Sequence, residues 1–123
     1  NANPKSMQEG LKTLKNYPCL GRRFFVIGDM LELGDLAESA HEKLGAAVTK
    51  YSIDYLVTVG SLSSLVTKSA LASGMDKKNI AAATEHKCAV AFLKKHLISG
   101  DCLLVKGSRG ARMEEIIKQL TAC

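Results

Sequence analysis

The chain has 123 residues, of which 46% are hydrophobic and 24% are charged, and its formal net charge is +5. This length and composition predict a single globular domain and exclude a disordered or fibrous chain. No apolar run approaches the roughly 20 residues of a membrane span, and we expect no secretory signal. The cations are scattered and there is no Trp, so a nucleic-acid-binding surface is disfavoured, whereas a small anionic ligand suits the charge.

Helical and strand-like segments alternate along the chain. The first helix is predicted to begin at Pro4, since Asn3 is a favourable N-cap and proline suits the first helical turn. Four further helices are predicted from apolar residues at helical spacing within 37–48, 62–70, 89–97 and 113–120, the last helix starting near Arg112. Four short apolar runs predict strands at Phe24–Ile27, Tyr55–Val59, Ile80–Ala83 and Cys102–Val105.

The runs are continuously apolar, which is typical of parallel strands that are covered on both faces. The alternating order predicts right-handed crossovers and a three-layer, doubly wound, mainly parallel α/β domain, Rossmann-like, with about four strands and five helices. Such a domain usually opens on a strand, so we expect a strand to precede Asn1.

The richest candidate site is the segment Lys106–Gly110, which follows a buried strand. Its glycines would permit a tight turn, and the exposed amides and the next helix N-terminus would attract an anion. Lys106, Arg109 and Arg112 add positive charge, and Ser108 adds a hydroxyl. A carboxylate or phosphate is the expected ligand, although an ordinary turn with solvated cations fits the pattern equally well.

A second candidate is Asp29, which follows the first strand, with Glu32 three residues later. A carboxylate there could bind a substrate ammonium or a ribose hydroxyl, or Asp29 could cap its own loop. His41 lies on an apolar helix stripe, where a core role is favoured over a catalytic one.

The four cysteines, Cys19, Cys88, Cys102 and Cys123, have no metal-site or C-x-x-C spacing. We expect reduced thiols, with Cys88 and Cys102 acting as small hydrophobes. The sequence has no G-x-x-x-x-G-K-[ST] loop, G-x-G-x-x-G fingerprint or G-x-S-x-G elbow, which predicts a ligand-binding domain without a complete catalytic apparatus.

Three segments carry a family resemblance: Asn1–Pro4 before Ser6 and Met7, Gly28–Gly34 before His41, and Lys106–Gly110 before Met113 and Glu114. In this order they resemble the C-terminal domain of the Mur ligases of the MurF type. The resemblance covers nearly the whole chain and implies that residues 1–123 are the third domain of a three-domain enzyme.

The resemblance implies a cytoplasmic, ATP-dependent ligase of peptidoglycan precursor synthesis. It would join D-alanyl-D-alanine to a UDP-N-acetylmuramoyl tripeptide, with ATP and Mg²⁺ bound chiefly by the central domain. Asn1 and Asn3 match the segment that reaches the nucleotide. Lys106, Ser108 and Arg109 match the loop that faces the dipeptide. The isolated domain is expected to be inactive.

In this interpretation, Arg109 or Lys106 pairs with the dipeptide carboxylate and Asp29 orients its amine. No catalytic base is identified, and nucleic acid and membrane are not expected partners. The interpretation requires that the turn at Arg109 and the acidic corner at Asp29 converge on one rim. The alternatives are a freestanding binding or scaffold module that has lost the reaction, and a flavodoxin-like nucleotide binder.

Overall fold

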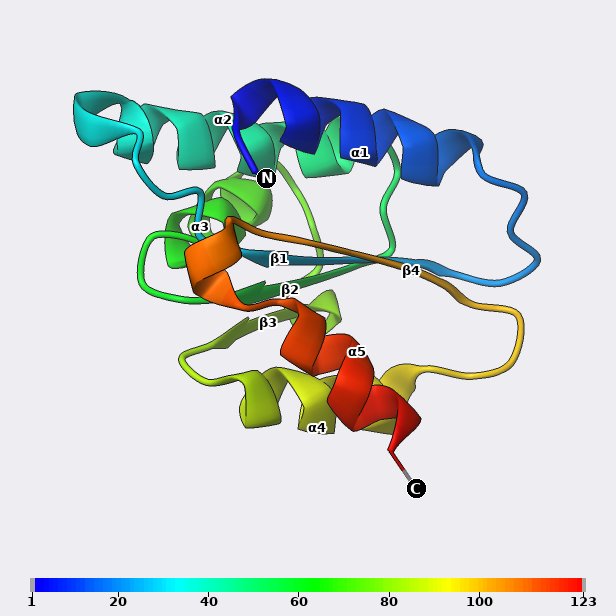
Figure 1. The fold of residues 1–123 in the computed structure, drawn as a ribbon. Coiled ribbons are helices and arrows are strands. Elements are labelled where there is room, and N and C mark those ends of the chain that lie inside the picture. The colour runs from blue at the N-terminus through cyan, green and yellow to red at the C-terminus, as the bar shows by residue number, and fades with distance from the viewer. Residues whose placement is uncertain (1, 123) are drawn as a thin grey trace.

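The computed structural model describes residues 2–122 and contains a four-stranded, wholly parallel sheet in the order β3-β2-β1-β4 (Figure 1). The strands are β1 (Arg23–Gly28), β2 (Tyr55–Val59), β3 (Ile80–Ala83) and β4 (Cys102–Lys106). The predicted strands are confirmed to within one residue at either end, because continuous apolar runs in buried parallel strands give a strong signal.

Helices cover both faces of the sheet (Figure 1). On one face lie α1 (Pro4–Asn16), α2 (Ala37–Lys50) and α3 (Ser64–Ala72), and on the other lie α4 (His86–His96) and α5 (Glu114–Thr121). Three short 3₁₀ helices, η1 (Gly34–Leu36), η2 (Lys77–Asn79) and η3 (Arg109–Ala111), lie in the connections. The three-layer α/β prediction is therefore confirmed.

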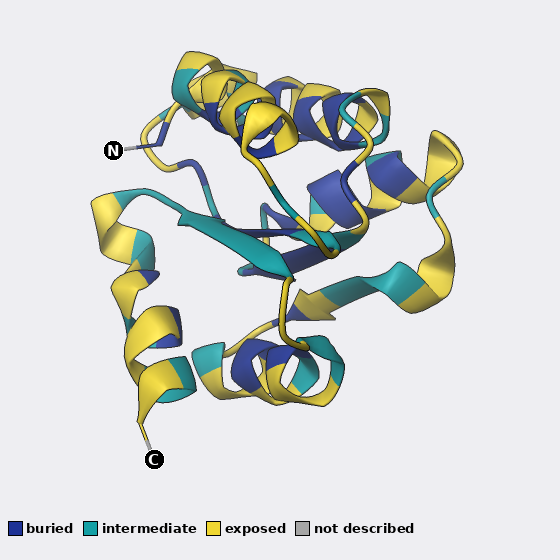
Figure 2. Cartoon of the chain, turned by 90° about the vertical axis from the view of Figure 1, so that its right-hand side faces the viewer, coloured by how far each residue is buried: buried dark blue, intermediate teal, exposed yellow. Residues whose placement is uncertain are grey.

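The sheet divides the core into two halves. Phe25 and Ile27 of β1 pack under α1, α2 and α3, whereas Phe24 and Val26 pack towards α4 and α5. Side chains of a strand alternate between its faces, so one apolar run supplies both halves. Figure 2 shows the buried segments of the helices turned towards the sheet and the exposed ones turned outward.

The start of α1 follows the predicted capping pattern. The Asn3 side-chain oxygen accepts from the Ser6 amide at 2.9 Å, and the Ser6 hydroxyl accepts from the Asn3 amide at 3.0 Å. Pro4 occupies the first turn, where no backbone donor is needed. This reciprocal cap fixes the direction in which the chain enters α1.

Two expectations about local structure are wrong. Cys88 is exposed on α4, because its position falls on the outer side of the helix rather than on the buried stripe of Ala89, Val90 and Leu93. The last helix starts at Glu114, not near Arg112, since η3 intervenes and Arg112 takes a left-handed conformation with φ of 51°.

The connections diverge at the carboxyl ends of β1 and β4. The chain leaves β1 for α2 on one face of the sheet and leaves β4 for α5 on the other. In open α/β sheets, ligands bind where neighbouring connections diverge in this way. Among the described residues, no helix is long and apolar enough to cross a membrane.

Candidate functional site

Three segments distant in the sequence meet at this divergence point. Ala2 before α1, Leu31 and Glu32 after β1, and the turn 108–110 after β4 line one hollow of about 310 Å³. The Ser108 amide donates to the Asp29 carbonyl at 3.3 Å. The backbone segments at Arg109 and Asp29 therefore lie at one rim, as expected. The side chains that face the hollow are not all the predicted ones.

Ser108 connects the walls of the hollow. Its hydroxyl accepts from the Leu31 amide at 2.9 Å and donates to the Ala2 carbonyl at 3.4 Å. The single hydroxyl proton is thereby used within the protein. Ser108 was predicted to bind substrate, and its contacts in this structure are those of a residue that positions the wall.

The Asp29 carboxylate faces the loop between β2 and α3 instead of the hollow. One oxygen accepts from the Ser63 amide at 2.6 Å and the other from the Leu62 amide at 3.3 Å. A Cβ on Gly60, whose φ is +118°, would lie 2.5 Å from the first oxygen, so this approach requires glycine. Asp29 thus caps the neighbouring connection, not its own loop.

His41 is fully buried and both of its ring nitrogens are paired. Nε2 accepts from the Met30 amide at 3.1 Å, and Nδ1 lies 2.6 Å from the Ala37 carbonyl. Because the Met30 amide can only donate, these partners assign the neutral tautomer with the proton on Nδ1. The predicted core role is confirmed, and His41 also holds the loop after β1 to α2.

Lys106 is separated from the hollow. Its aliphatic carbons lie against Gly10 of α1, where a Cβ would come within 2.8 Å of Cδ. Its side chain lines a different hollow with Glu9 and Thr13. Binding a carboxylate beside Arg109 would require the side chain to leave α1.

Asn1 and Asn3 are the two candidate nucleotide contacts. Asn3 uses its side-chain oxygen to cap α1, which leaves its NH₂ group without a partner among residues 2–122. Asn1 lies outside the described residues.

Arg109 and Glu32 carry the charges of the hollow. Both are exposed, and within residues 2–122 neither side chain has a hydrogen bond or an ion pair. A guanidinium binds a carboxylate through two parallel hydrogen bonds, and a carboxylate accepts from an ammonium. A hollow with both groups suits a small zwitterion.

Of the two acidic residues in the segment after β1, Asp29 was the predicted contact for the amine, whereas Glu32 is the one that lines the hollow. Glu32 has a left-handed backbone conformation with φ of 61°, which is uncommon for a residue with a side chain. The residue types around Glu32 do not predict that conformation. Asp29 directly follows a predicted strand, which is where a ligand contact is expected.

The predicted anion site at the last helix is not supported. The first turn of α5 contains Glu114 and Glu115, whose charge opposes anion binding there. Gly107 has no left-handed conformation; a Cβ there would lie 2.5 Å from Met113 Cγ, so glycine serves close packing. The positive charge of the site therefore rests on the Arg109 side chain.

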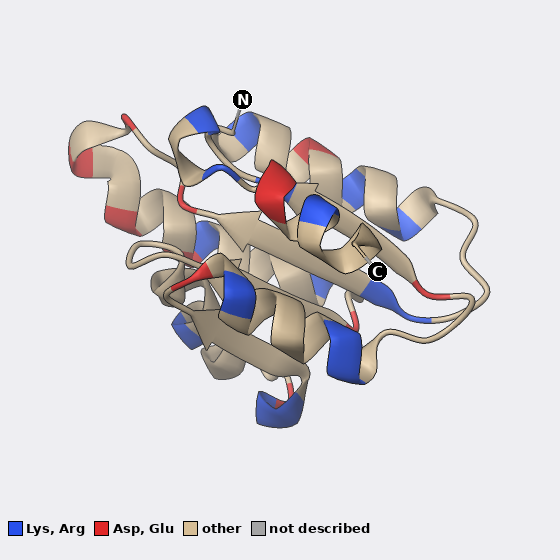
Figure 3. Ribbon diagram, turned by 60° about the horizontal axis from the view of Figure 1, so that its bottom comes forward, with Lys and Arg blue, Asp and Glu red and all other residues tan. Residues whose placement is uncertain are grey.

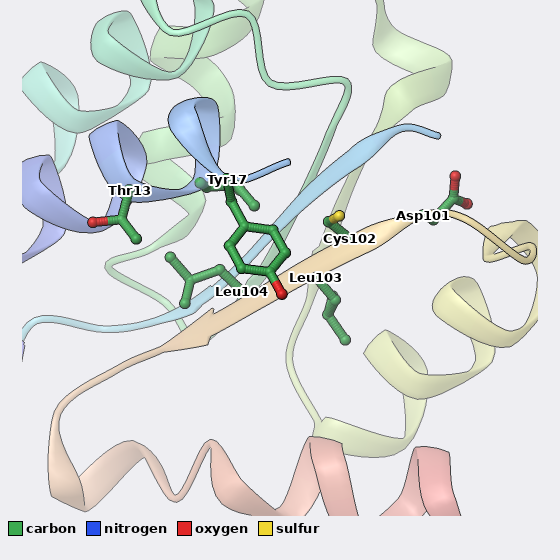
Figure 4. Close-up of a pocket in the computed structure, with 7 residues that line it drawn as sticks. Thr13, Tyr17, Asp101, Cys102, Leu103 and Leu104 are labelled. Carbon is green, nitrogen blue, oxygen red and sulfur yellow. The ribbon is translucent and has the colours of Figure 1, made fainter. Parts of the chain in front are cut away.

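Another hollow of the structure is lined by different kinds of side chain. A larger one, of about 460 Å³, lies along the outer edge of β4 and is lined mainly by apolar side chains together with Tyr17, Thr13 and Asp101 (Figure 4). Within residues 2–122, no group of three or more His, Cys, Asp or Glu could hold a metal ion.

Comparison with known families agrees with this fold and site. The family model for the glutamate ligase domain of Mur ligases matches residues 1–109. The chain therefore belongs to the Mur ligase family, as a C-terminal domain.

Individual relatives are more specific. The chain is 37% identical over 120 residues to the UDP-N-acetylmuramoyl-tripeptide–D-alanyl-D-alanine ligase of Bacillus subtilis and 34% identical to that of Escherichia coli. Both matches cover 98% of this chain but only 26% and 25% of the relatives. A crystal structure of MurF from Acinetobacter baumannii superposes with a TM-score of 0.83 at 31% identity, over 98% of this chain and 26% of that one.

Proposed function

We propose that this chain is the C-terminal domain of a cytoplasmic, ATP-dependent ligase that adds D-alanyl-D-alanine to a UDP-N-acetylmuramoyl tripeptide during peptidoglycan synthesis. Two relatives with that name match almost the whole chain. Because the chain spans about a quarter of their length, the activity would belong to a longer protein, and the domain alone would be inactive.

The observation that carries the proposal is the hollow where Arg109 and Glu32 present charges that have no partner within residues 2–122. We assign the dipeptide carboxylate to Arg109, which can donate two hydrogen bonds. We assign its ammonium to Glu32, which would hold the amine before it loses a proton and attacks. Asp29 and Ser108 would act by fixing the walls.

The nucleotide would be held mainly outside this chain. The Asn3 NH₂ group is a donor suited to an oxygen of ATP, and Ala2 beside it borders the hollow. Mg²⁺ would be bound chiefly by the central domain, as the family resemblance implies. ATP would supply the phosphoryl group that converts the tripeptide carboxylate into an acyl phosphate with release of ADP, and this domain would present the amine that displaces phosphate.

The test is amide formation by the longer protein with ATP and the UDP-N-acetylmuramoyl tripeptide. We expect ADP and the pentapeptide product with D-alanyl-D-alanine, and no product with D-glutamate in its place. We also expect no ADP release from residues 1–123 alone. Product with D-glutamate but not with the dipeptide, or turnover by the isolated chain, would contradict the proposal.

A further inference from the structure

Two cysteines lie together at the opposite end of the sheet. Cys19 is in the loop between α1 and β1, and Cys102 is the first residue of β4. Both residues are partly exposed, and the neighbouring Cys19 thiol raises the pKa of the Cys102 thiol. Figure 4 shows Cys102 at the beginning of β4, where it also borders the hollow along the strand edge.

The backbone holds the two cysteines in place. The Arg22 carbonyl accepts from the Cys102 amide at 2.9 Å and from the Cys19 thiol at 3.6 Å. The Cys19 thiol also lies 3.6 Å from the Gly100 carbonyl, and the Cys102 thiol lies 3.9 Å from the Pro18 carbonyl. Each thiol therefore lies against the backbone segment of the other cysteine, which places the two side chains close together, as an intramolecular disulfide requires.

We propose that Cys19 and Cys102 are a reversible modification site that a small-molecule disulfide, such as oxidised glutathione, converts into an intramolecular disulfide. Neither the family resemblance nor the proposed function assigns a role to either residue. The site lies at the amino end of the sheet, away from the hollow with Arg109, and therefore stands independently of the ligase proposal.

The reaction proceeds by two exchanges. One thiolate attacks a sulfur of oxidised glutathione, forms a mixed disulfide and releases one glutathione thiolate. The second protein thiolate attacks the protein sulfur of that mixed disulfide, forms the Cys19–Cys102 bond and releases the second glutathione. The protein loses two electrons and two protons, and the two electrons reduce one oxidised glutathione to two thiols.

The order of attack follows from the surroundings of Cys102. The adjacent Cys19 thiol and burial both raise the pKa of the Cys102 thiol. Less of it is then thiolate at neutral pH, so Cys102 is the slower first nucleophile. Cys19 makes the first attack and Cys102 resolves the mixed disulfide.

The experiment uses a background in which Cys88→Ser and Cys123→Ser leave this pair as the cysteines of residues 1–123. After incubation with oxidised glutathione, we expect a mass loss of two hydrogens, a peptide linking residues 19 and 102, and a Tm higher by about 5–15 °C. Dithiothreitol should reverse all three. A stable glutathione adduct without the link, or a dimer linked between chains, would overturn the proposal.

Two single variants in the same background test the order of attack. With Cys102→Ser, the glutathione adduct at Cys19 should accumulate because nothing resolves it. With Cys19→Ser, the adduct at Cys102 should form at least about threefold more slowly. Faster modification of Cys102 than of Cys19 would contradict the assigned roles.

Discussion

The two ends of the sheet differ in whether their charged side chains are paired. At the amino end, the Arg22 guanidinium pairs with Asp101 at 2.9 Å, donates to the Tyr55 hydroxyl at 2.8 Å and lies over the Tyr55 ring at 4.8 Å. At the carboxyl end, Arg109 and Glu32 are exposed and have no such partner among residues 2–122.

The difference indicates that the paired charges at the amino end stabilise the fold, whereas the charges at the carboxyl end are available to bind a ligand. At the carboxyl end, the walls are held by hydrogen bonds of His41, Ser108 and Asp29 to backbone amides, so the charges of Arg109 and Glu32 are not needed to build them. Figure 3 shows charged segments spread over the helices and loops, so the distinction lies in pairing rather than in the amount of charge. We expect mutations at the amino end to reduce stability and mutations of the hollow charges to affect ligand alone.

The largest expected effect on stability is that of Asp101→Ala. The Asp101 side chain is 1% exposed and accepts from the Arg22 amide at 2.8 Å, from the Ile98 amide at 2.9 Å and from the Arg22 guanidinium. Leaving these donors unpaired should lower the free energy of unfolding by about 3–4 kcal/mol, measured by urea denaturation.

The matched control is Glu85→Gln, which removes an exposed ion pair with Lys87 at 3.8 Å. Its free energy of unfolding should change by less than about 0.5 kcal/mol. Equal losses of unfolding free energy in the two variants would contradict the distinction between a pair with a buried carboxylate and an exposed pair.

Lowering the pH should reduce the stability that Asp101 contributes at the amino end of the sheet. Burial raises the pKa of Asp101, but the hydrogen bonds from Arg22 and Ile98 outweigh it and hold that pKa below its usual range. The unfolded chain then takes up the proton first as pH falls, so stability is lost below about pH 4 and is present above it. Asp101→Asn should flatten this part of the stability–pH curve; an unchanged slope would contradict the assignment.

An intermediate effect is expected at the wall of the hollow. His41→Phe removes the acceptor of the Met30 amide and should cost about 1–3 kcal/mol, with faster hydrogen exchange at that amide. His41→Gln keeps an acceptor and should restore part of the protection. Unchanged Met30 exchange in His41→Phe would show that the contact does not hold the loop.

The smallest effect on stability is expected for the hollow charges. Arg109→Ala and Glu32→Gln remove no hydrogen bond or ion pair among the residues that the structure describes, and each should leave the free energy of unfolding within about 0.5 kcal/mol of the parent. A loss above about 1 kcal/mol in urea denaturation would mean that these side chains support the fold.

Backbone features were more predictable from the sequence than side-chain directions. The apolar run at Phe24–Ile27 and the Asn3-Pro4 cap are local signals, and both were correct. Lys106 and Asp29 were placed at the correct strand ends, but their side chains turn to α1 and to the loop before α3. Those directions depend on Gly10 and Gly60, which are distant in sequence and give no local signal.

The most direct test of the central claim compares D-alanyl-D-alanine with its C-terminal carboxamide as substrates of the longer protein. If Arg109 binds the carboxylate, the parent should prefer the dipeptide by about 10- to 100-fold in kcat/KM, and Arg109→Ala should lose that preference. The control Lys77→Ala, which removes an exposed cation on η2 before β3, should keep it. An undiminished preference in Arg109→Ala would contradict the account.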